Sequence, residues 1–407
     1  MRGMTDHLTF GKRVRFYRER RGLRQRELGE LLNRSEDWVY RVESDRIPVN
    51  SIKTQTDLAD ALRVHLEDLQ GSPTLLDDHG DAKGSVPAIR AALMQSRHLS
   101  GDLFDNREVP RLERVKVEVD RAWTLYQGSE YARLGEVLPG LLADARLAVH
   151  SHTSGPDKAK AQRAIALALH VAAVYLRKLG ETNLAWTAID QGDVVASELA
   201  DPVVTLAVRR GIAHVQLGAG LADEAVSITQ DAAQEVTAAW WRSSPETVSV
   251  YGTLFLNGAI AAARLGDDTL TEEMLSKAQG AADELGGNRN EMWTSFGPAN
   301  VQIHRLATAL EFEDFDQALA IASQPKAARL AVGLPVERQA RLRLDMARAY
   351  GEAHRMEDAV ANLKRAFKTA PEQIRAHDLA RDLARRLAKQ TRQRDVHELA
   401  VRLGAVK

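Results

Sequence analysis

The 407-residue chain contains no cysteine, which excludes disulfide bonds and thiolate chemistry and makes a reducing compartment the natural expectation. Aromatic residues make up only 5% of the chain, although 44% of its residues are hydrophobic. The core must therefore be built mainly from Ala, Leu, Val and Ile. Such a composition favours helices that pack closely through small side chains.

Long apolar segments are also missing. The opening stretch, MRGMTDHLTFGKRVRF, has no apolar region of the kind found in a secretion signal. The longest nearly apolar run, AIALALHVAAVYL, has 13 residues between Arg163 and Arg177 and is too short to span a bilayer. We therefore expect a soluble, cytoplasmic protein with no membrane partner.

The residue patterns typical of enzymes are absent as well. The sequence has no glycine-rich phosphate loop, no His-Glu-x-x-His motif and no nucleophile elbow. His150 and His152 lie near one loop, but two histidines alone are a weak indication of a metal site. We expect no catalytic activity, no cofactor and no bound metal.

The net charge of −1 says nothing about nucleic acid, but the distribution of charge does. Residues 1–26 hold nine Lys or Arg against two carboxylates. Such a run is either a solvated helix face or an electrostatic footprint for a phosphate backbone. The segments that follow favour the second interpretation.

Five segments between residues 10 and 70 have apolar side chains at helical spacing. Two of them, 25–32 and 35–43, are joined by a tight turn at Asn33, a residue that tolerates the left-handed conformation. Ser35 is a good N-cap for the second helix. Two helices joined in this way form a helix-turn-helix, whose second helix enters the major groove of DNA.

The segment GLRQRELGELLNRSEDWVYRVES resembles the lambda-repressor-like, XRE family of bacterial helix-turn-helix regulators. The resemblance covers about 60 residues, and RSEDWV is similar to actinobacterial-type regulators that carry a C-terminal helical-repeat domain. The sequence departs from the family pattern at Gly29, Asn33 and Arg34, and we expect Gly29 to loosen the first helix of the motif. The resemblance also implies an internal salt bridge between Arg18 and Glu43.

The resemblance implies that Gln25 contacts a phosphate and that Glu36, Asp37 and Arg41 lie where the family reads bases. The two carboxylates have two interpretations: they stabilise the positive end of the helix dipole, or one accepts a hydrogen bond from cytosine N4. Trp38 either packs on the domain surface or contacts a thymine methyl group or a sugar. The predicted DNA-binding residues are Arg24, Gln25, Arg26, Arg34, Ser35, Glu36, Asp37, Trp38, Arg41, Arg46 and Lys53.

Segments rich in Gly, Ser, Asp and Pro follow this unit and predict loops, with the short helix AIRAALMQ between them. We expect a DNA-binding domain at residues 1–72, a linker with a short helix at 73–111, and a helical repeat domain at 112–407. The linker is expected to tether the first domain flexibly rather than to fuse it rigidly.

The C-terminal part shows a helical repeat. Breaks between helices are predicted at Gly180, Gly220, Gly266, Glu313 and His354, with spacings of 40, 46, 47 and 41 residues. Ala lies five residues after four of the five breaks and seven residues before four of them, so paired helices can approach closely. The pattern resembles tetratricopeptide repeats with a longer and irregular period.

This second resemblance implies that the first helix of each pair lines a concave surface. Positions counted back from each break are rich in Arg, His and Asn, which can bind carboxylates and peptide backbones; the alternative is a merely solvated groove. The predicted ligand-facing residues are His170, Arg177, Lys178, Arg210, His214, Asn257, Arg264, Asn300, His304, Arg341 and Arg348.

The sequence therefore predicts an all-α protein, a five-helix lambda-repressor-like domain followed by an irregular tetratricopeptide-like α-solenoid. The predicted function is a sequence-specific transcriptional regulator that binds a double-stranded DNA operator as a homodimer. Its repeat domain would sense a peptide, a small molecule or a protein partner and control operator binding. The alternative is a scaffold tethered to DNA, whose repeat domain recruits another protein.

Overall fold

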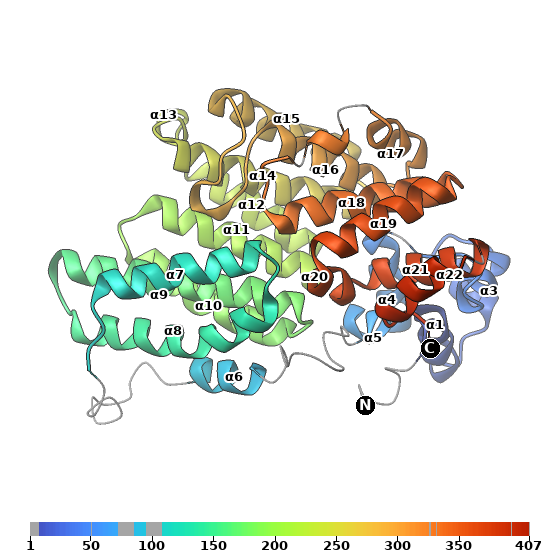
Figure 1. Ribbon diagram of the computed structural model, residues 1–407, viewed down its shortest axis with the longest axis horizontal. Helices are drawn as coiled ribbons and strands as arrows, with labels where there is room; N and C mark the ends of the chain where they lie inside the picture. The colour runs from blue at the N-terminus through green and yellow to red at the C-terminus, as the bar shows by residue number, and fades with distance from the viewer. Residues whose placement is uncertain are drawn as a thin grey trace.

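The computed structural model describes residues 8–49, 51–71, 85–94, 108–324, 327–330, 332–391 and 393–406. These residues form helices α1 to α22, two short 3-10 turns and the loops between them, and none of them belongs to a β-strand (Figure 1). The all-α class is confirmed. The helices form a small N-terminal domain and a long series of helical pairs.

The N-terminal domain has the five expected helices. They are α1 (Phe10–Arg20), α2 (Gln25–Leu31), α3 (Glu36–Glu43), α4 (Ile52–Leu62) and α5 (Leu66–Gln70). They enclose one apolar core built from residues of every helix, including Phe10, Val14, Leu28, Val39, Val42, Leu58 and Leu69. The α2–α3 pair is the predicted helix-turn-helix.

Local chemistry fixes the ends of these helices. Ser35 and Ser51 cap α3 and α4, each accepting a hydrogen bond from the third residue after it. Asn33 takes the left-handed conformation that the sequence predicted, with φ of 56°. Gly29 permits the tight turn after α2, because a Cβ there would lie 2.7 Å from the Arg34 carbonyl oxygen. That it also loosens α2 stays a prediction.

The repeat domain, here called the array, consists of α7 to α22, and all of these helices except the short α13 and α20 form successive antiparallel pairs. Its helices are α7 (Leu112–Gln127), α8 (Tyr131–Ser151), α9 (Gly155–Lys178), α10 (Thr182–Glu198), α11 (Pro202–Ala219), α12 (Ala222–Gln234), α13 (Ala238–Trp241), α14 (Pro245–Leu265), α15 (Asp268–Leu285), α16 (Pro298–Glu311), α17 (Phe315–Ala322), α18 (Val336–Glu352), α19 (Met356–Thr369), α20 (Pro371–Ala376), α21 (Asp378–Thr391) and α22 (Arg394–Arg402).

The predicted repeat breaks are all confirmed by the backbone. The residues at all five breaks have positive φ, with values of 73°, 84°, 78°, 58° and 57° for Gly180, Gly220, Gly266, Glu313 and His354. The small residues predicted on either side of each break are buried, as at Ala173 and Ala185, so the paired helices meet through them. The irregular helical-hairpin solenoid is therefore established by the structure.

The short helix expected in the linker is α6 (Val86–Met94), and it contributes to the core of the array. Ile89 and Leu93 are buried against α8, and the side-chain amide of Gln191 in α10 donates to the Leu93 carbonyl at 3.0 Å. The loops predicted before and after α6 lie for the most part outside the described residues.

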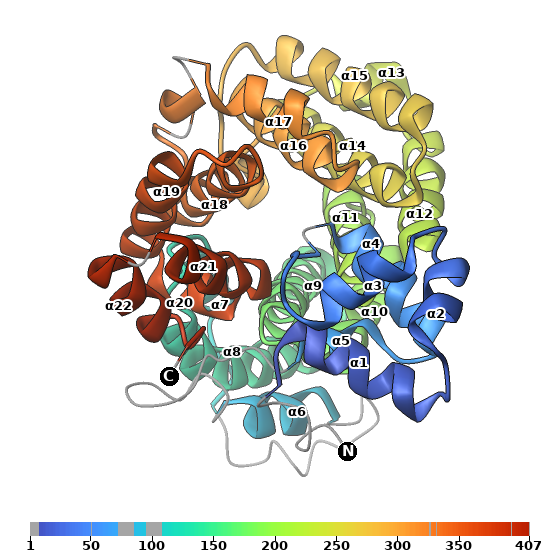
Figure 2. The same cartoon turned by 90° about the vertical axis from the view of Figure 1, so that its right-hand side faces the viewer.

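The array closes into a ring, which the sequence did not predict (Figure 2). Its first helix, α7, packs against α18 near the other end of the array. Ser129 donates to the side-chain oxygen of Gln373 at 2.8 Å, and Glu372 accepts from the Ala132 amide at 2.9 Å. The inner side of the ring is formed by the first helices of the pairs, including α9, α11, α14, α16 and α18 (Figure 2).

One described helix, α14, is long and apolar enough to cross a membrane. With 21 residues it is longer than the 13-residue run that the sequence analysis took as the longest apolar segment. In the structure, 72% of its most apolar stretch is buried within the protein. It packs against α11, α12, α15 and α16, as expected for the core helix of the array.

Candidate DNA-binding surface and interdomain cavity

The N-terminal end of α3 presents the two carboxylates in question to solvent. Glu36 and Asp37 are both exposed, and the Asp37 carboxylate lies 3.9 Å from the guanidinium of Arg41 along the same face. Ser35 accepts a hydrogen bond from the Trp38 amide at 3.1 Å, so its hydroxyl serves the helix cap. Trp38 is half-buried, and the Arg34 guanidinium lies over its ring at 5.4 Å from the centroid.

Glu43 joins three helices of the N-terminal domain. Its carboxylate accepts from Arg18 Nε at 2.5 Å and Nη2 at 3.0 Å, which confirms the predicted salt bridge. The Gln25 amide, predicted to contact a phosphate, donates to the same carboxylate at 2.7 Å. Gln25 therefore holds the start of α2 against α1 and α3 in this structure.

The basic run of the N-terminal domain has both internal and external members. Arg13 is buried and donates to the carbonyl groups of Leu8, Leu69 and Gln70, so it holds the two ends of the domain together. Among the predicted DNA-binding cations, Arg24, Arg26, Arg34, Arg41 and Arg46 are exposed, and Lys53 is half-buried. Arg26 pairs with Glu30 at 2.8 Å, and Arg46 lies over the ring of Tyr40.

The turn between α16 and α17 contacts this domain directly. We call residues 311–316 the acidic turn, because the sequence EFEDFD carries four carboxylates in six residues. The Glu311 carboxylate accepts from the Ile52 backbone amide at 2.8 Å, and the Ser51 hydroxyl donates to the Glu311 carbonyl at 3.1 Å. Glu311 thus lies at the N-terminal end of α4, where the helix dipole favours an anion.

Glu313 contacts two more polar groups of the N-terminal domain. It accepts from the Thr54 hydroxyl at 2.8 Å and from Arg34 Nη2 at 3.0 Å. A cavity of about 330 Å³ beside this contact is lined by Arg34, Trp38 and Lys53 on one side and by the acidic turn on the other. Three predicted DNA-binding residues therefore face the array. Sequence reasoning missed this contact, although the run of carboxylates at the repeat break is visible in the sequence.

Two predicted ligand-facing residues meet directly inside the ring. Arg177 of α9 donates from Nη2 to His214 Nε2 of α11 at 2.6 Å. Arg341 and Arg348 of α18 lie on either side of Asp345, at 2.7 and 2.9 Å. The buried Arg210 forms no ion pair with any residue in the described ranges, and its Nε has no acceptor there.

The two predicted asparagines already use their amides within the array. Asn257 donates to the Arg210 carbonyl at 3.0 Å, and Asn300 donates to the Ser295 carbonyl at 3.1 Å. The backbone carbonyl of Asn300 accepts from His304 Nδ1 at 2.8 Å. His170 is buried, and neither of its ring nitrogens has a hydrogen-bond partner in the described structure. A peptide backbone would have to displace the existing partner of Asn257.

Burial keeps the histidines of the ring neutral. It lowers the pKa of His170, His214 and His377 well below the usual value, with neighbouring cations adding to the effect. Burial, together with Arg338, lowers the pKa of His304 to about 3. Within the described ranges, no three His, Asp or Glu side chains are grouped as a metal site.

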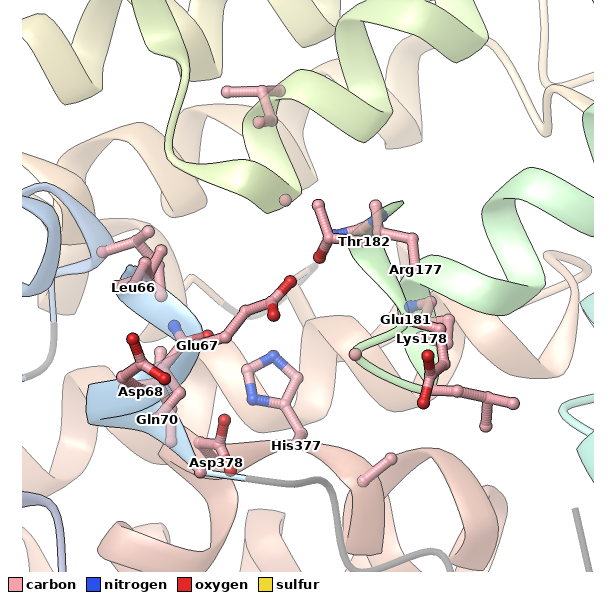
Figure 3. Close-up of a pocket in the computed structure, with 18 of the residues that line it drawn as sticks. Leu66, Glu67, Asp68, Gln70, Arg177, Lys178, Glu181, Thr182, His377 and Asp378 are labelled. Atoms are coloured by element: carbon pink, nitrogen blue, oxygen red, sulfur yellow. The ribbon is translucent and has the colours of Figure 1, made fainter. Parts of the chain in front are cut away.

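A second cavity, of about 260 Å³, lies between the N-terminal domain and the inner side of the ring (Figure 3). We call it the interdomain cavity. Its walls include α5, the α9–α10 turn, the ends of α11 and α14, and the α20–α21 junction. Four of the predicted ligand-facing residues line it: Arg177, Lys178, Arg264 and Arg341.

Residues that the sequence analysis did not single out complete this cavity. Glu67 extends from α5 into it, towards the ring of His377, and Asp378 lies beside them (Figure 3). Nothing in the sequence indicated these residues, because they come from segments about 300 positions apart that only the closed ring brings together.

Comparison with known proteins identifies the N-terminal domain. Residues 9–70 match a family model described as a helix-turn-helix domain. No curated protein matches the chain.

Three solved structures show weak likeness. BtubC (BKLC) from P. vanneervenii is 17% identical, covering 64% of this chain and 91% of its own, with a TM-score of 0.39. Bacillus thuringiensis PlcR in complex with the peptide PapR7 and DNA is 14% identical, covering 68% and 95%, with a TM-score of 0.30. A Rap protein complexed with Competence and Sporulation Factor is 12% identical, covering 72% and 96%, with a TM-score of 0.44. At these values the likenesses carry no conclusion about the function of this chain.

Proposed function

We propose that this chain is a sequence-specific transcriptional regulator of the XRE type rather than an enzyme. It binds a double-stranded operator as a cytoplasmic homodimer, and its array senses a ligand or partner and controls that binding. The helix-turn-helix domain at residues 9–70 supports the DNA-binding part of the proposal. A dimer would place two copies of α3 about one DNA turn (~34 Å) apart.

The observation that carries the regulatory part is the contact made by the acidic turn. Glu311 and Glu313 bind the N-terminal end of α4 and the guanidinium of Arg34. Helix N-termini and arginines are the groups with which DNA-binding domains hold phosphates. Because a carboxylate and a phosphate compete for the same donors, docking of the N-terminal domain on the array opposes DNA binding.

Within this proposal, Arg41, Glu36 and Asp37 read bases from the exposed face of α3. Arg24, Arg26 and Arg46 provide phosphate contacts from the surrounding surface, joined by Arg34 and Lys53 once the domain leaves the acidic turn. A ligand or partner regulates operator binding by favouring either the docked or the released arrangement, since only a difference in affinity between the two can shift their populations.

The test is footprinting of the purified protein on fragmented DNA from its own source at two salt concentrations. We expect enrichment of a short palindrome that Arg41→Ala weakens by about 10- to 100-fold, the usual effect of losing one base contact. The control is Arg121→Ala, because Arg121 in α7 is as exposed as Arg41, at 51% against 50%, and lies outside the N-terminal domain. Binding without a motif, or equal binding by the two variants, would instead support the scaffold alternative.

A further inference from the structure

We infer that Arg264 is a positioning residue through which the array holds the N-terminal domain in its docked arrangement. Arg264 lies in the last turn of α14, immediately before the repeat break at Gly266. It acts through Glu311, the carboxylate that binds the start of α4. The inference rests on the proposed function, because it concerns the same docked arrangement that opposes DNA binding.

Helix α4 lies across the breaks of three successive repeats and packs against α14 (Figure 2). At the first of these breaks, a Cβ on Gly220 would lie 3.4 Å from Cγ2 of Thr56. At the second, a Cβ on Gly266 would lie 3.4 Å from Cε of Lys53. The third break, at Glu313, belongs to the acidic turn, which binds α4 directly. The docking of α4 therefore depends on the relative positions of three repeats.

Arg264 joins the ends of the three inner helices that lead to these breaks. Its Nη1 donates to the Leu217 carbonyl oxygen near the end of α11 at 2.6 Å. Its Nε lies 3.4 Å from Oε1 of Glu311, the last residue of α16. One guanidinium reaches both acceptors, so the contact with Glu311 depends on how α11, α14 and α16 are placed relative to one another.

Glu311 connects Arg264 to the N-terminal domain. Its second carboxylate oxygen, Oε2, accepts from the backbone amide of Ile52 at 2.8 Å and lies 3.4 Å from the Lys53 amide. Both members of the ion pair are buried, with 14% of the Arg264 side chain and 4% of the Glu311 side chain exposed. Burying a carboxylate without its cation is costly. Arg264 therefore stabilises the docked arrangement by neutralising the carboxylate that lies beneath α4.

Two other cations near the Glu311 carboxylate have partners of their own. Lys53 pairs with Asp57 at 2.8 Å, and Nε of Arg341 donates to Asp345 at 2.7 Å. Loss of the arginine in α14 therefore leaves the carboxylate without a bonded cation in the described ranges.

The experiment is hydrogen-exchange mass spectrometry of the full chain without DNA, with fragmentation to resolve the first amides of α4. The first amides of a helix have no acceptor within it, so exchange at Ile52 and Lys53 reports their contact with Glu311 directly. Arg264→Gln should speed this exchange by about tenfold, as expected for the loss of one charged hydrogen bond. Exchange in the buried helix α9 should stay unchanged, which would show that the array remains folded.

Two further variants separate the charge of Arg264 from its bulk. Arg264→Lys keeps a cation beside Glu311, so exchange at the start of α4 should stay within about threefold of the unsubstituted protein. Arg305→Gln is the matched control, because it removes another arginine–glutamate pair between neighbouring repeats, with Glu272 at 2.9 and 3.0 Å. Equal exchange in the Gln and Lys variants of Arg264, or equally fast exchange in Arg305→Gln, would overturn the proposal.

A double-mutant cycle tests whether Arg264 acts through Glu311. In Glu311→Gln the start of α4 already exchanges fast, so adding Arg264→Gln should change its exchange little. Additive effects would mean that Arg264 supports the domain by another route, and the proposal would fall.

Failure of this inference and failure of the proposed function are distinguishable, since hydrogen exchange needs no DNA. Fluorescence anisotropy with the footprinted operator should show several-fold tighter binding by Arg264→Gln. Faster exchange without tighter binding keeps the role of Arg264 and overturns the claim that docking opposes DNA binding. Tighter binding by Glu311→Gln, with neither effect in Arg264→Gln, keeps the regulator and overturns the role of Arg264.

Discussion

At the scale of single residues, we expect the inner histidines to make the stability of the array depend on pH. Burial depresses the pKa of His170, His214, His304 and His377 in the folded state. In the unfolded chain each histidine takes up a proton near pH 6.5. Below that pH the unfolded state binds more protons than the folded state, so stability falls as the pH falls.

We predict that the unfolding free energy decreases below about pH 6.5, by up to about 1.4 kcal/mol per pH unit for each neutral buried histidine. For His304 the loss continues down to its folded-state pKa of about 3. Chemical denaturation at pH 7.5, 6.5 and 5.5 measures the slope. His304→Gln should reduce the slope by about one proton; a slope equal to that of the unsubstituted protein would contradict this account.

The same scale shows where sequence reasoning reached its limit. The salt bridge between Arg18 and Glu43 could be predicted because both residues belong to a recognisable motif. The partner of Arg34 could not, because Glu313 comes from a turn 279 positions away whose approach depends on the path of the whole array. The role of Gly29 in the turn could not be predicted for a similar reason, since the close approach of the Arg34 carbonyl depends on the exact geometry of the turn.

At the scale of elements, the repeat breaks were the most predictable feature of the chain. A short motif of small residues around a left-handed position depends only on local geometry, so it can be recognised from spacing alone. Two of the breaks, Glu313 and His354, use residues that have a Cβ in a conformation that favours glycine. The closure of the ring was not predictable, because it results from small rotations summed over all the pairs.

The left-handed conformation of a residue with a Cβ at the fifth break predicts a stabilising substitution. His354 is exposed and has φ of 57°, so His354→Gly should remove backbone strain and raise the unfolding free energy by about 0.5–1 kcal/mol. His354→Ala is the matched control, because it also removes the imidazole but retains the Cβ. Urea denaturation of the two variants should separate them; an equal change in both would assign the effect to the lost imidazole instead.

At the scale of the whole molecule, the ring and the N-terminal domain form one continuous structure. The acidic turn contacts α4, α4 also packs against α14, and α5 forms one wall of the interdomain cavity. The sequence predicted the N-terminal domain and the array as separate parts and expected a flexible tether. Their direct contact could not be predicted, since surface carboxylates at a repeat break are equally compatible with simple solvation.

We predict that loosening this contact increases DNA affinity. Glu313→Gln removes the ion pair with Arg34, which is partly exposed and worth at most about 1 kcal/mol, so the affinity should rise about two- to fivefold. Adding Glu311→Gln also weakens the buried contact with the α4 amide and should raise the affinity to about tenfold above the starting value.

Asp316→Asn is the matched control, because Asp316 belongs to the same acidic turn and is exposed. It removes the same charge without removing a contact to the N-terminal domain. Fluorescence anisotropy on the footprinted operator, at fixed salt, measures the dissociation constants of all three variants. If Asp316→Asn raises the affinity as much as Glu313→Gln, the effect is general repulsion between the acidic turn and DNA. If only the Glu311 and Glu313 variants gain affinity, the acidic turn opposes DNA by occupying the groups that would otherwise bind its phosphates.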